Sequence, residues 1–190
     1  MKLLENKGLA LIIMIVLIIG GFWLGGYKSL AGLYDDVEKV FFTGEDGDGI
    51  CIENDLSERA EAAVNMVTVA RKYVGESNEV RMLSDAAAAL TAAGKSSDIA
   101  DRLSADNELE TAMSALYRSL ENAGLSEKDE TYRQRLYADF NSRGDTISHD
   151  PYNSYAQSFN RALSRFPANL IAAVTPIEQA VIFYYNSDSK

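Results

Sequence analysis

The residues best suited to acid–base or metal chemistry are few in this chain of 190 residues. It contains one histidine, His149, which stands beside Asp150, and one cysteine, Cys51. A histidine next to a carboxylate can act as a general base or bind a metal ion. However, no strained nucleophile turn accompanies this pair, and a zinc site needs several closely spaced ligands. We therefore interpret His149 as a loop residue before a helix-starting proline, and we predict no catalytic residue, no bound cofactor and no metal site.

The acidic loop at residues 45–49 (EDGDG) is the clearest candidate for a ligand site. Its Asp46 and Asp48 match the first two calcium positions of an EF-hand loop. The next position holds Ile50 instead of Asp or Asn, and the glycine comes one residue early. We favour a solvated flexible loop. Cation binding by residues 45–55 is the alternative, and a calcium titration would test it.

Two asparagines, Asn153 and Asn160, lie seven residues apart and therefore share one line on a helix. Each follows an aromatic residue, Tyr152 or Phe159. Together they could form a platform for a ligand, or they could belong to a packed helix face. We favour the packed face, because a buried asparagine paired with a neighbouring helix fixes register in bundles. On this interpretation, Asn160→Leu should raise stability while loosening the uniqueness of the fold.

The asparagines belong to a predicted helix that begins at Pro151 and ends near Phe166. Pro167 should end or kink this helix, and a shorter apolar segment follows it. The apolar residues of the helix recur at spacings of three or four, which places them on one face. They are Tyr152, Tyr155, Phe159, Leu163 and Phe166, and those of the shorter segment are Leu170, Ile171, Val174 and Ile177.

The same stretch resembles the C-terminal signature of the LemA family. The shared pattern is Tyr152-Asn153, five residues, Phe159-Asn160, five more residues and then residues 166–170 (FPANL). The resemblance implies an elongated antiparallel bundle of long helices behind a single membrane anchor. It implies no catalytic role, since the family has no established enzyme activity to carry over.

Departures from the family pattern lie upstream of the signature. Residues 55–74 resemble the family's first long helix, where the family carries two adjacent arginines and a Leu-Ile-Pro-Asn-Leu run. Here only Arg59 and residues 65–67 (NMV) are kept. Where the family has an unbroken helix before the Tyr-Asn pair, this chain has residues 149–151 (HDP).

The first apolar stretch is long enough to cross a membrane. Residues 8–26 contain no charged or strongly polar side chain, and as a helix they would extend about 28 Å. Trp23 and Tyr27 stand at the C-terminal end, where amphipathic rings prefer the headgroup layer. A cleaved signal peptide, cut near residues 29–31 (SLA), is the alternative, although its apolar region would be shorter. We predict a retained anchor in residues 1–28 that contacts the lipid bilayer through residues 8–26.

Charge bears on the location of the protein and on its partners. Lys2 and Lys7 precede the apolar stretch, and Lys28 and Lys39 follow it, so the positive-inside bias is slight. We favour a single-pass membrane protein with its bundle domain on the extracytoplasmic side. The net charge of −10, with basic residues scattered among acids, argues against binding of nucleic acid or of an anionic membrane surface.

The rest of the chain has helical spacing, and no window alternates apolar and polar residues as a strand would. Residues 29–54 form a juxtamembrane segment, into which the first helix can extend by two turns before residues 43–54 break it. Residues 55–185 form a LemA-like bundle domain. The fold class is thus all-α: an N-terminal transmembrane helix followed by an elongated antiparallel helical bundle.

Local signals mark the ends of the bundle helices. Asp55, with Glu58 three residues later, resembles a capping box, and Ser126 should cap a later helix. Residues 141–150 are polar and contain a glycine, which favours a loop before the signature helix. We expect helices at residues 55–74, 80–93, 97–120, 126–140 and 151–166, with Gly75, Gly94 and Gly124 between them.

These features predict a membrane-anchored, non-enzymatic helical-bundle protein that serves as a scaffold or interaction module in the cell envelope. Its partner would be another envelope protein or a second copy of the chain. The alternative is a small-ligand or calcium-binding protein with a pocket between bundle helices. A di-iron bundle site is excluded, because such sites take a histidine from each of two helices and the chain has one histidine.

Overall fold

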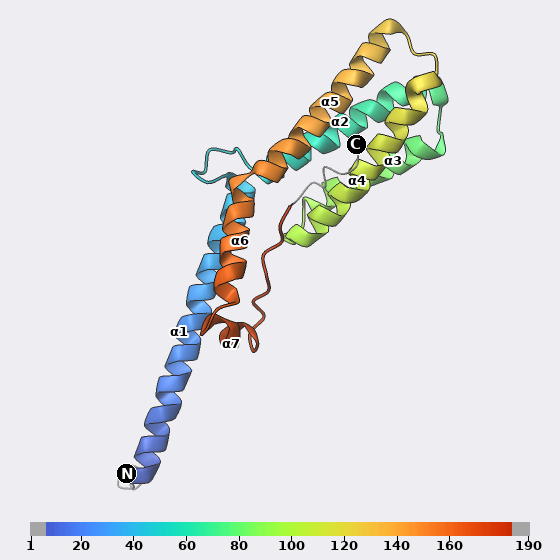
Figure 1. The fold of residues 1–190 in the computed structure, drawn as a ribbon. Helices are drawn as coiled ribbons and strands as arrows, with labels where there is room; N and C mark the ends of the chain where they lie inside the picture. The colour runs from blue at the N-terminus through green and yellow to red at the C-terminus, as the bar shows by residue number, and fades with distance from the viewer. Residues whose placement is uncertain (1–6, 184–190) are drawn as a thin grey trace. The chain divides into compact units, whose positions relative to one another are not determined.

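The computed structural model describes residues 7–183, and every regular element within them is a helix (Figure 1). The predicted all-α fold class is therefore confirmed. The elements are α1 (Lys7–Thr43), α2 (Ile52–Val74), α3 (Asn78–Ala93), α4 (Ile99–Ser119), the 3₁₀ turn η1 (Leu120–Asn122), α5 (Glu127–His149), α6 (Pro151–Leu163) and α7 (Ala168–Ala172).

The described residues divide into two compact units. One, which we call the α1 unit, contains residues 7–38 and 155–180. The other, the bundle unit, contains residues 39–154 and 181–183. The predicted division into an anchor, a juxtamembrane segment and a bundle domain, with boundaries after residues 28 and 54, stays a prediction. The two units are defined by compactness, which does not test that division.

The bundle unit is built from α2, α3, α4 and α5, joined by short connections. Helix α2 packs against both α3 and α5, and α3 packs against α4. Apolar residues of α2 at helical spacing face this core, where Leu56, Ala63 and Val67 are buried. Because each helix has one apolar stripe, pairing the helices removes all the stripes from water together.

The ends of the bundle helices follow the expected local chemistry at two places. Gly75 ends α2 with a φ of 60°, and Gly124 precedes α5 with a φ of 69°. Both values lie in the left-handed region that glycine adopts without steric cost. The Ser126 side chain accepts a hydrogen bond from the Asp129 N–H at 3.2 Å, so the predicted cap of α5 is confirmed.

The loop predicted at residues 141–150 is wrong, because α5 continues through it to His149. Gly144 and Ile147 are buried, and Arg143 forms ion pairs with Asp55 at 3.0 Å and Glu58 at 2.5 Å, both on α2. These contacts with α2 favour helix in a stretch whose own helix propensity is weak.

The capping box predicted at Asp55 is also wrong. Helix α2 begins three residues earlier, at Ile52, and Cys51 occupies the N-cap position without a side-chain bond. Asp55 is buried in the first turn, and its carboxylate accepts a hydrogen bond from Arg143 instead of capping the helix. The local pattern assigned the Asp55 side chain to the helix end, but in the structure this side chain binds Arg143, which is distant in the sequence.

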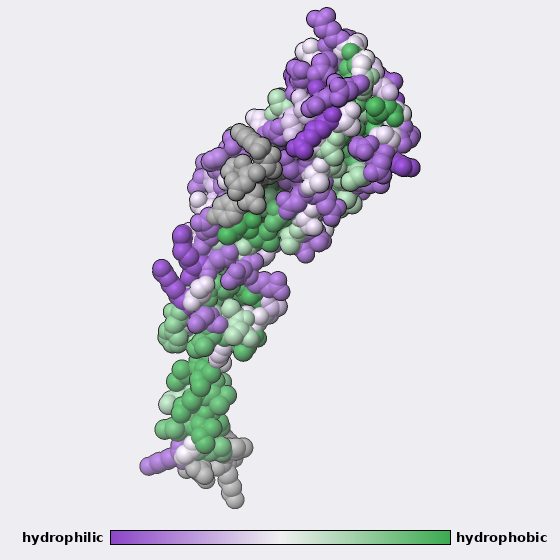
Figure 2. Space-filling model, turned by 45° about the vertical axis from the view of Figure 1, so that its right-hand side comes forward, coloured by the Kyte–Doolittle hydropathy of each residue, from purple (hydrophilic) through white to green (hydrophobic). Residues whose placement is uncertain are grey.

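In the α1 unit, α1 is continuous from Lys7 to Thr43, and Gly44 follows it with a φ of 84°. Among residues 7–183, α1 alone is long and apolar enough to cross a membrane. Its apolar side chains point outward, with Leu17 69% and Leu24 66% exposed. Figure 2 shows this part of α1 as an almost unbroken hydrophobic surface at the lower end of the view.

The remainder of the α1 unit packs against the second half of α1. Phe159 of α6 lies edge to face against Tyr34, with 5.4 Å between ring centroids. Leu30 and Leu163 are buried in the same unit. Helix α6 ends at Leu163, before Pro167, and the short helix α7 follows, as the predicted break requires.

Candidate functional site

Arg59 occupies the centre of the bundle unit and is fully buried. Its guanidinium binds Asp106 at 2.9 Å and Glu110 at 2.6 Å, both on α4, and donates to the Phe140 carbonyl on α5 at 3.2 Å. The guanidinium carbon lies 3.8 Å from the centroid of the Phe140 ring. One side chain of α2 thus connects three helices.

This network is suited to fixing helix register and not to proton transfer. Arginine stays protonated in proteins, and the carboxylate of Asp106, which is 1% exposed, balances its charge. Removing one member of such a pair leaves an isolated buried charge, which costs about 3–5 kcal/mol. Arg59 is the residue that the sequence retains at the position of the family's paired arginines, and the structure gives it a structural role.

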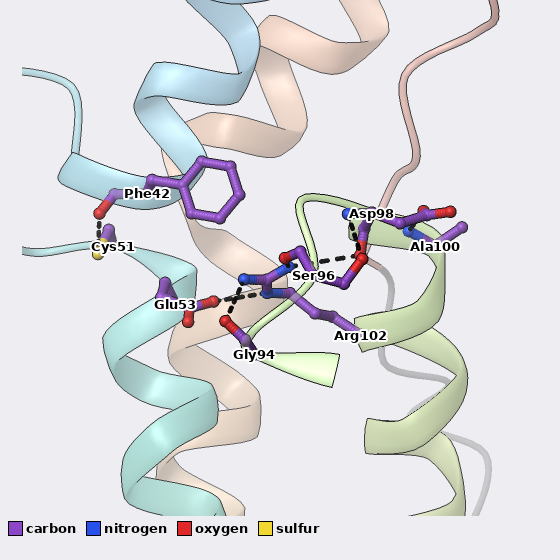
Figure 3. Close-up of polar contacts among 8 residues, drawn as sticks. All are labelled: Phe42, Cys51, Glu53, Gly94, Ser96, Asp98, Ala100 and Arg102. Atoms are coloured by element: carbon purple, nitrogen blue, oxygen red, sulfur yellow. Dashed lines mark hydrogen bonds and ion pairs between the residues drawn. The ribbon is translucent and has the colours of Figure 1, made fainter. Parts of the chain in front are cut away.

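Arg102 of α4 forms a second buried cluster, drawn in Figure 3. Its guanidinium pairs with Glu53 of α2 at 2.7 Å and donates to the carbonyls of Gly94, at 2.9 Å, and of Ser96. The ring of Phe42 lies 5.0 Å from the guanidinium carbon. Arg102 therefore ties the start of α2 to the connection between α3 and α4.

Arg133 of α5 repeats this arrangement at another place in the bundle unit. It binds Glu130 at 2.7 Å, donates to the Tyr117 carbonyl of α4 at 2.7 Å, and lies 4.0 Å from the Tyr117 ring centroid. The hydrogen bond from Arg133 lowers the pKa of the Glu130 carboxyl, so this pair remains ionised well below neutral pH. Each of these buried arginines makes at least one hydrogen bond or ion pair to another helix of the bundle unit.

Cys51 is buried at the start of α2, and its thiol donates to the Phe42 carbonyl at 3.4 Å (Figure 3). Burial raises the pKa of the Cys51 thiol, which disfavours the nucleophilic thiolate. The thiol therefore has the properties of a structural cysteine.

In the acidic loop, a side-chain carboxylate forms a hydrogen bond with the backbone of the loop itself. Asp48 accepts a hydrogen bond from the Ile50 N–H at 2.9 Å, and the Asn54 side chain donates to the Gly49 carbonyl at 2.5 Å. Within residues 7–183, no three histidine, cysteine or carboxylate side chains gather as a metal site would require. The predicted solvated loop and its alternative, calcium binding, both stay untested.

His149 and Asp150 bind different partners. His149 is the last residue of α5, not a loop residue as predicted, and its Nδ1 lies 2.9 Å from the Asp145 carbonyl oxygen. Asp150 is buried, and it accepts a hydrogen bond from the Tyr152 N–H at 2.8 Å, which caps α6. Burial raises the pKa of the Asp150 carboxyl, and the nearby charges of Asp55 and Glu45 add to this effect.

The first half of the signature, Tyr152-Asn153, binds main chain in the bundle unit. The Asn153 side chain donates to the Ile147 carbonyl at 2.9 Å and accepts from the Phe183 N–H at 2.9 Å. The Tyr152 hydroxyl donates to the Val181 carbonyl at 2.7 Å. Asn153 is buried and packed, as expected, and the segment that it holds is the extended chain near the C-terminus.

The second half of the signature makes a similar contact in the α1 unit. The Asn160 side chain donates to the Ala180 carbonyl at 2.9 Å and accepts from the Ala180 N–H at 2.8 Å. The amide of Asn160 thus satisfies both polar groups of one residue, as a neighbouring strand would. The predicted pairing with a neighbouring helix is confirmed for Asn153, which donates to the Ile147 carbonyl of α5, and is wrong for Asn160, whose partner Ala180 lies outside the helices.

Sequence reasoning missed the segment at residues 180–183 as the partner of the signature. An asparagine that binds main chain leaves no mark on the side chains of its partner, because any residue offers the same N–H and C=O groups. The only available signal was the repeat of an aromatic-asparagine pair at a spacing of seven, which placed both amides on one helix line.

Open hollows on the bundle unit lie along helix pairs. One of about 690 Å³ lies between α3 and α4 and is lined in part by Met82, Ala86 and Asn107. Another of about 400 Å³ lies between α2 and α3 and includes Arg102 and Glu53, whose charges are already paired. Asp85 and Glu108 also line the larger hollow, and Glu61 and Lys95 also line the smaller one.

The comparison with known families decides the relationship that the signature indicated. The family model of the LemA family matches residues 50–190. The chain belongs to the LemA family. The match begins after α1 and includes the signature asparagines and the helices of the bundle unit. No curated protein and no solved structure matches this LemA family member.

Proposed function

We propose that this LemA family member is a single-pass membrane protein whose helical bundle serves as a non-enzymatic interaction module on the extracytoplasmic side of the cell envelope. The exposed apolar surface of α1 over residues 8–26 carries the proposal. Burial of apolar surface is favourable by about 25 cal/mol per Å². A helix of this length therefore finds its stable environment in the hydrocarbon layer of a bilayer.

The arrangement of the bundle supports a binding role rather than catalysis. Arg59, Arg102 and the thiol of Cys51 are buried and engaged in contacts that hold helices together. A bundle stiffened in this way presents fixed helix faces to a partner, and preorganised surfaces lose less entropy on binding. The partner in this proposal is another envelope protein or a second copy of the chain.

Two measurements on intact cells test the two halves of the proposal. The chain should remain in the membrane fraction after alkaline extraction, and external protease should cleave the bundle only after the outer barrier is opened. Release by alkaline extraction would contradict the anchor, and protection from protease in cells lacking that barrier would contradict the extracytoplasmic side.

Crosslinking in the same cells tests the interaction role. We expect the chain in species heavier than the monomer, and mass spectrometry of these species would separate self-association from a second envelope protein. Recovery of the monomer alone, at crosslinker levels that capture a known envelope complex, would contradict the interaction role and leave the anchor unaffected.

A further inference from the structure

A second apolar surface lies in the α1 unit, around the short helix α7. No charged residue occurs from Phe166 through Ile177. Three large side chains in this segment face outward: Phe166 is 79% exposed, Leu170 51% and Val174 70%. We call these three residues the α7 patch. Exposed apolar groups this close together are unfavourable in water, so the patch marks a surface that meets another apolar phase.

The position of α7 along α1 indicates which apolar surroundings the α7 patch contacts. The buried side chain of Ile171 lies against Gly26, where a β-carbon would collide with its terminal methyl group. Figure 1 shows α7 beside α1. Gly26 is also the last residue of the uncharged run that begins at Gly8. The missing side chain at Gly26 therefore lets α7 dock where the apolar part of α1 ends.

The thickness of a bilayer indicates where α7 lies relative to the hydrocarbon layer. From Gly8 to Gly26 a helix rises about 27 Å, close to the thickness of the hydrocarbon layer. When residues 8–26 span that layer, Gly26 lies at its boundary, and so does α7. Exposed basic residues border both apolar segments at this point, Lys28 just after Gly26 and Arg165 just before Phe166. Such side chains extend to the headgroups while their stems remain in apolar surroundings.

We propose that the α7 patch inserts into the interfacial layer of the same bilayer that α1 spans, so that the protein meets the membrane at two places. This inference rests on the proposed membrane anchor. A lone spanning helix is free to rotate about its axis, whereas a side element held in the interface fixes its rotation and tilt. The FPANL segment of the family signature, residues 166–170, is then a lipid-contacting element rather than part of the bundle core.

Tryptophan fluorescence of the full chain in phosphatidylcholine vesicles tests this proposal, because the chain contains only Trp23. The double variant Trp23→Phe/Phe166→Trp moves the single fluorophore to the α7 patch. We expect blue-shifted emission and strong quenching by lipids brominated near the headgroup end of the acyl chain. Emission at the wavelength of water-exposed tryptophan, without quenching, would overturn the proposal.

A matched control places the fluorophore in the bundle unit, at another exposed aromatic residue. The variant Trp23→Phe/Tyr132→Trp should emit as in water and resist quenching, and equal quenching of this control would also overturn the proposal. Trp23→Phe/Val174→Trp gives a second report from the patch if the Phe166 substitution disturbs folding, which circular dichroism would reveal.

The unaltered chain separates failure of the anchor from failure of this inference. Quenching of Trp23 by brominated lipid reports insertion of α1. If Trp23 is not quenched, the membrane anchor itself fails. If Trp23 is quenched while the Phe166→Trp emission is blue-shifted but not quenched, protein covers the patch, as in contact with a second copy, and the lipid assignment is overturned.

Discussion

The two units of this protein differ in where they place charge and apolar surface. Every buried charged side chain among residues 7–183 belongs to the bundle unit, and these residues are Asp55, Arg59, Arg102, Asp106, Arg133 and Asp150. The α1 unit relies instead on neutral contacts, such as the Asn160 amide on Ala180 and the ring of Phe159 on Tyr34. Its large apolar side chains lie outward over residues 8–26.

This difference is consistent with the proposal that α1 lies in a bilayer while the bundle unit lies in water. In water, apolar side chains must be enclosed, and buried ion pairs can then fix which helix meets which. In hydrocarbon, apolar side chains gain by facing outward, while an unpaired charge is costly near the middle of the bilayer. The predictions below test this contrast, from the largest expected effect to the smallest.

The largest effect should come from breaking the Arg59 network. Arg59→Ala leaves the buried Asp106 carboxylate without its cation, and we expect a loss of about 3–5 kcal/mol in the free energy of unfolding. Denaturant unfolding of the full chain in detergent would measure it. Arg71→Ala is the matched control, because Arg71 forms an exposed pair with Glu76 at 2.8 Å, and it should cost less than about 1 kcal/mol. Equal losses for both variants would contradict a structural role for Arg59.

A charge within the apolar run should weaken membrane insertion. Leu17→Arg places a cation near the middle of residues 8–26, at a cost of about 2.5–3.5 kcal/mol in a bilayer. We expect a larger fraction of the chain in the soluble phase after alkaline extraction, whereas Leu17→Phe should behave as the unaltered chain does. If both variants remain fully in the membrane, the span lies elsewhere or the run does not cross the bilayer.

For the signature asparagine Asn160, the structure predicts a change in stability of opposite sign to the one that the sequence predicts. The sequence predicts that Asn160→Leu stabilises the protein, but in the structure this change leaves the N–H and C=O groups of Ala180 without partners. We therefore expect a loss of about 1–3 kcal/mol. Thermal unfolding would measure it, and limited proteolysis should cut near residue 180 sooner. A rise in melting temperature would restore the original prediction.

The smallest effect concerns Asp150 and depends on pH. Burial raises the pKa of its carboxyl in the folded state, so the folded chain holds a proton that the unfolded chain releases near pH 4. Stability attributable to this group is thus present below about pH 4 and falls as pH rises through the raised pKa. Asp150→Asn keeps the cap without the charge.

We expect Asp150→Asn to be slightly more stable than the unaltered chain at pH 7 and to lose this part of the pH dependence. Asp150→Ala removes the cap and should cost about 1 kcal/mol. Melting temperatures between pH 4 and 8 would measure both. A destabilised Asp150→Asn at neutral pH would show that the ionised carboxylate has a favourable partner.

Features set by neighbouring residues could be predicted from the sequence. The spacing of apolar residues gave the helices, and the glycines at positions 75 and 124 gave their ends. The uncharged run gave the candidate span, and the signature gave the family. Each of these depends on residues within a few turns of one another, so the pattern is present in the chain itself.

Only the tertiary structure decided which groups meet. Arg59 and Asp106 are 47 positions apart, and Arg143 and Asp55 are 88 apart. The contact with Asp55 also accounts for the helix through residues 141–149 that local propensity failed to predict. The partner of Asn160 is main chain, which carries no sequence signal. A local pattern can determine that a side chain is polar and lies on a given helix face, but its partner depends on how the helices pack, because burial leaves each polar group only the partners that packing brings within reach.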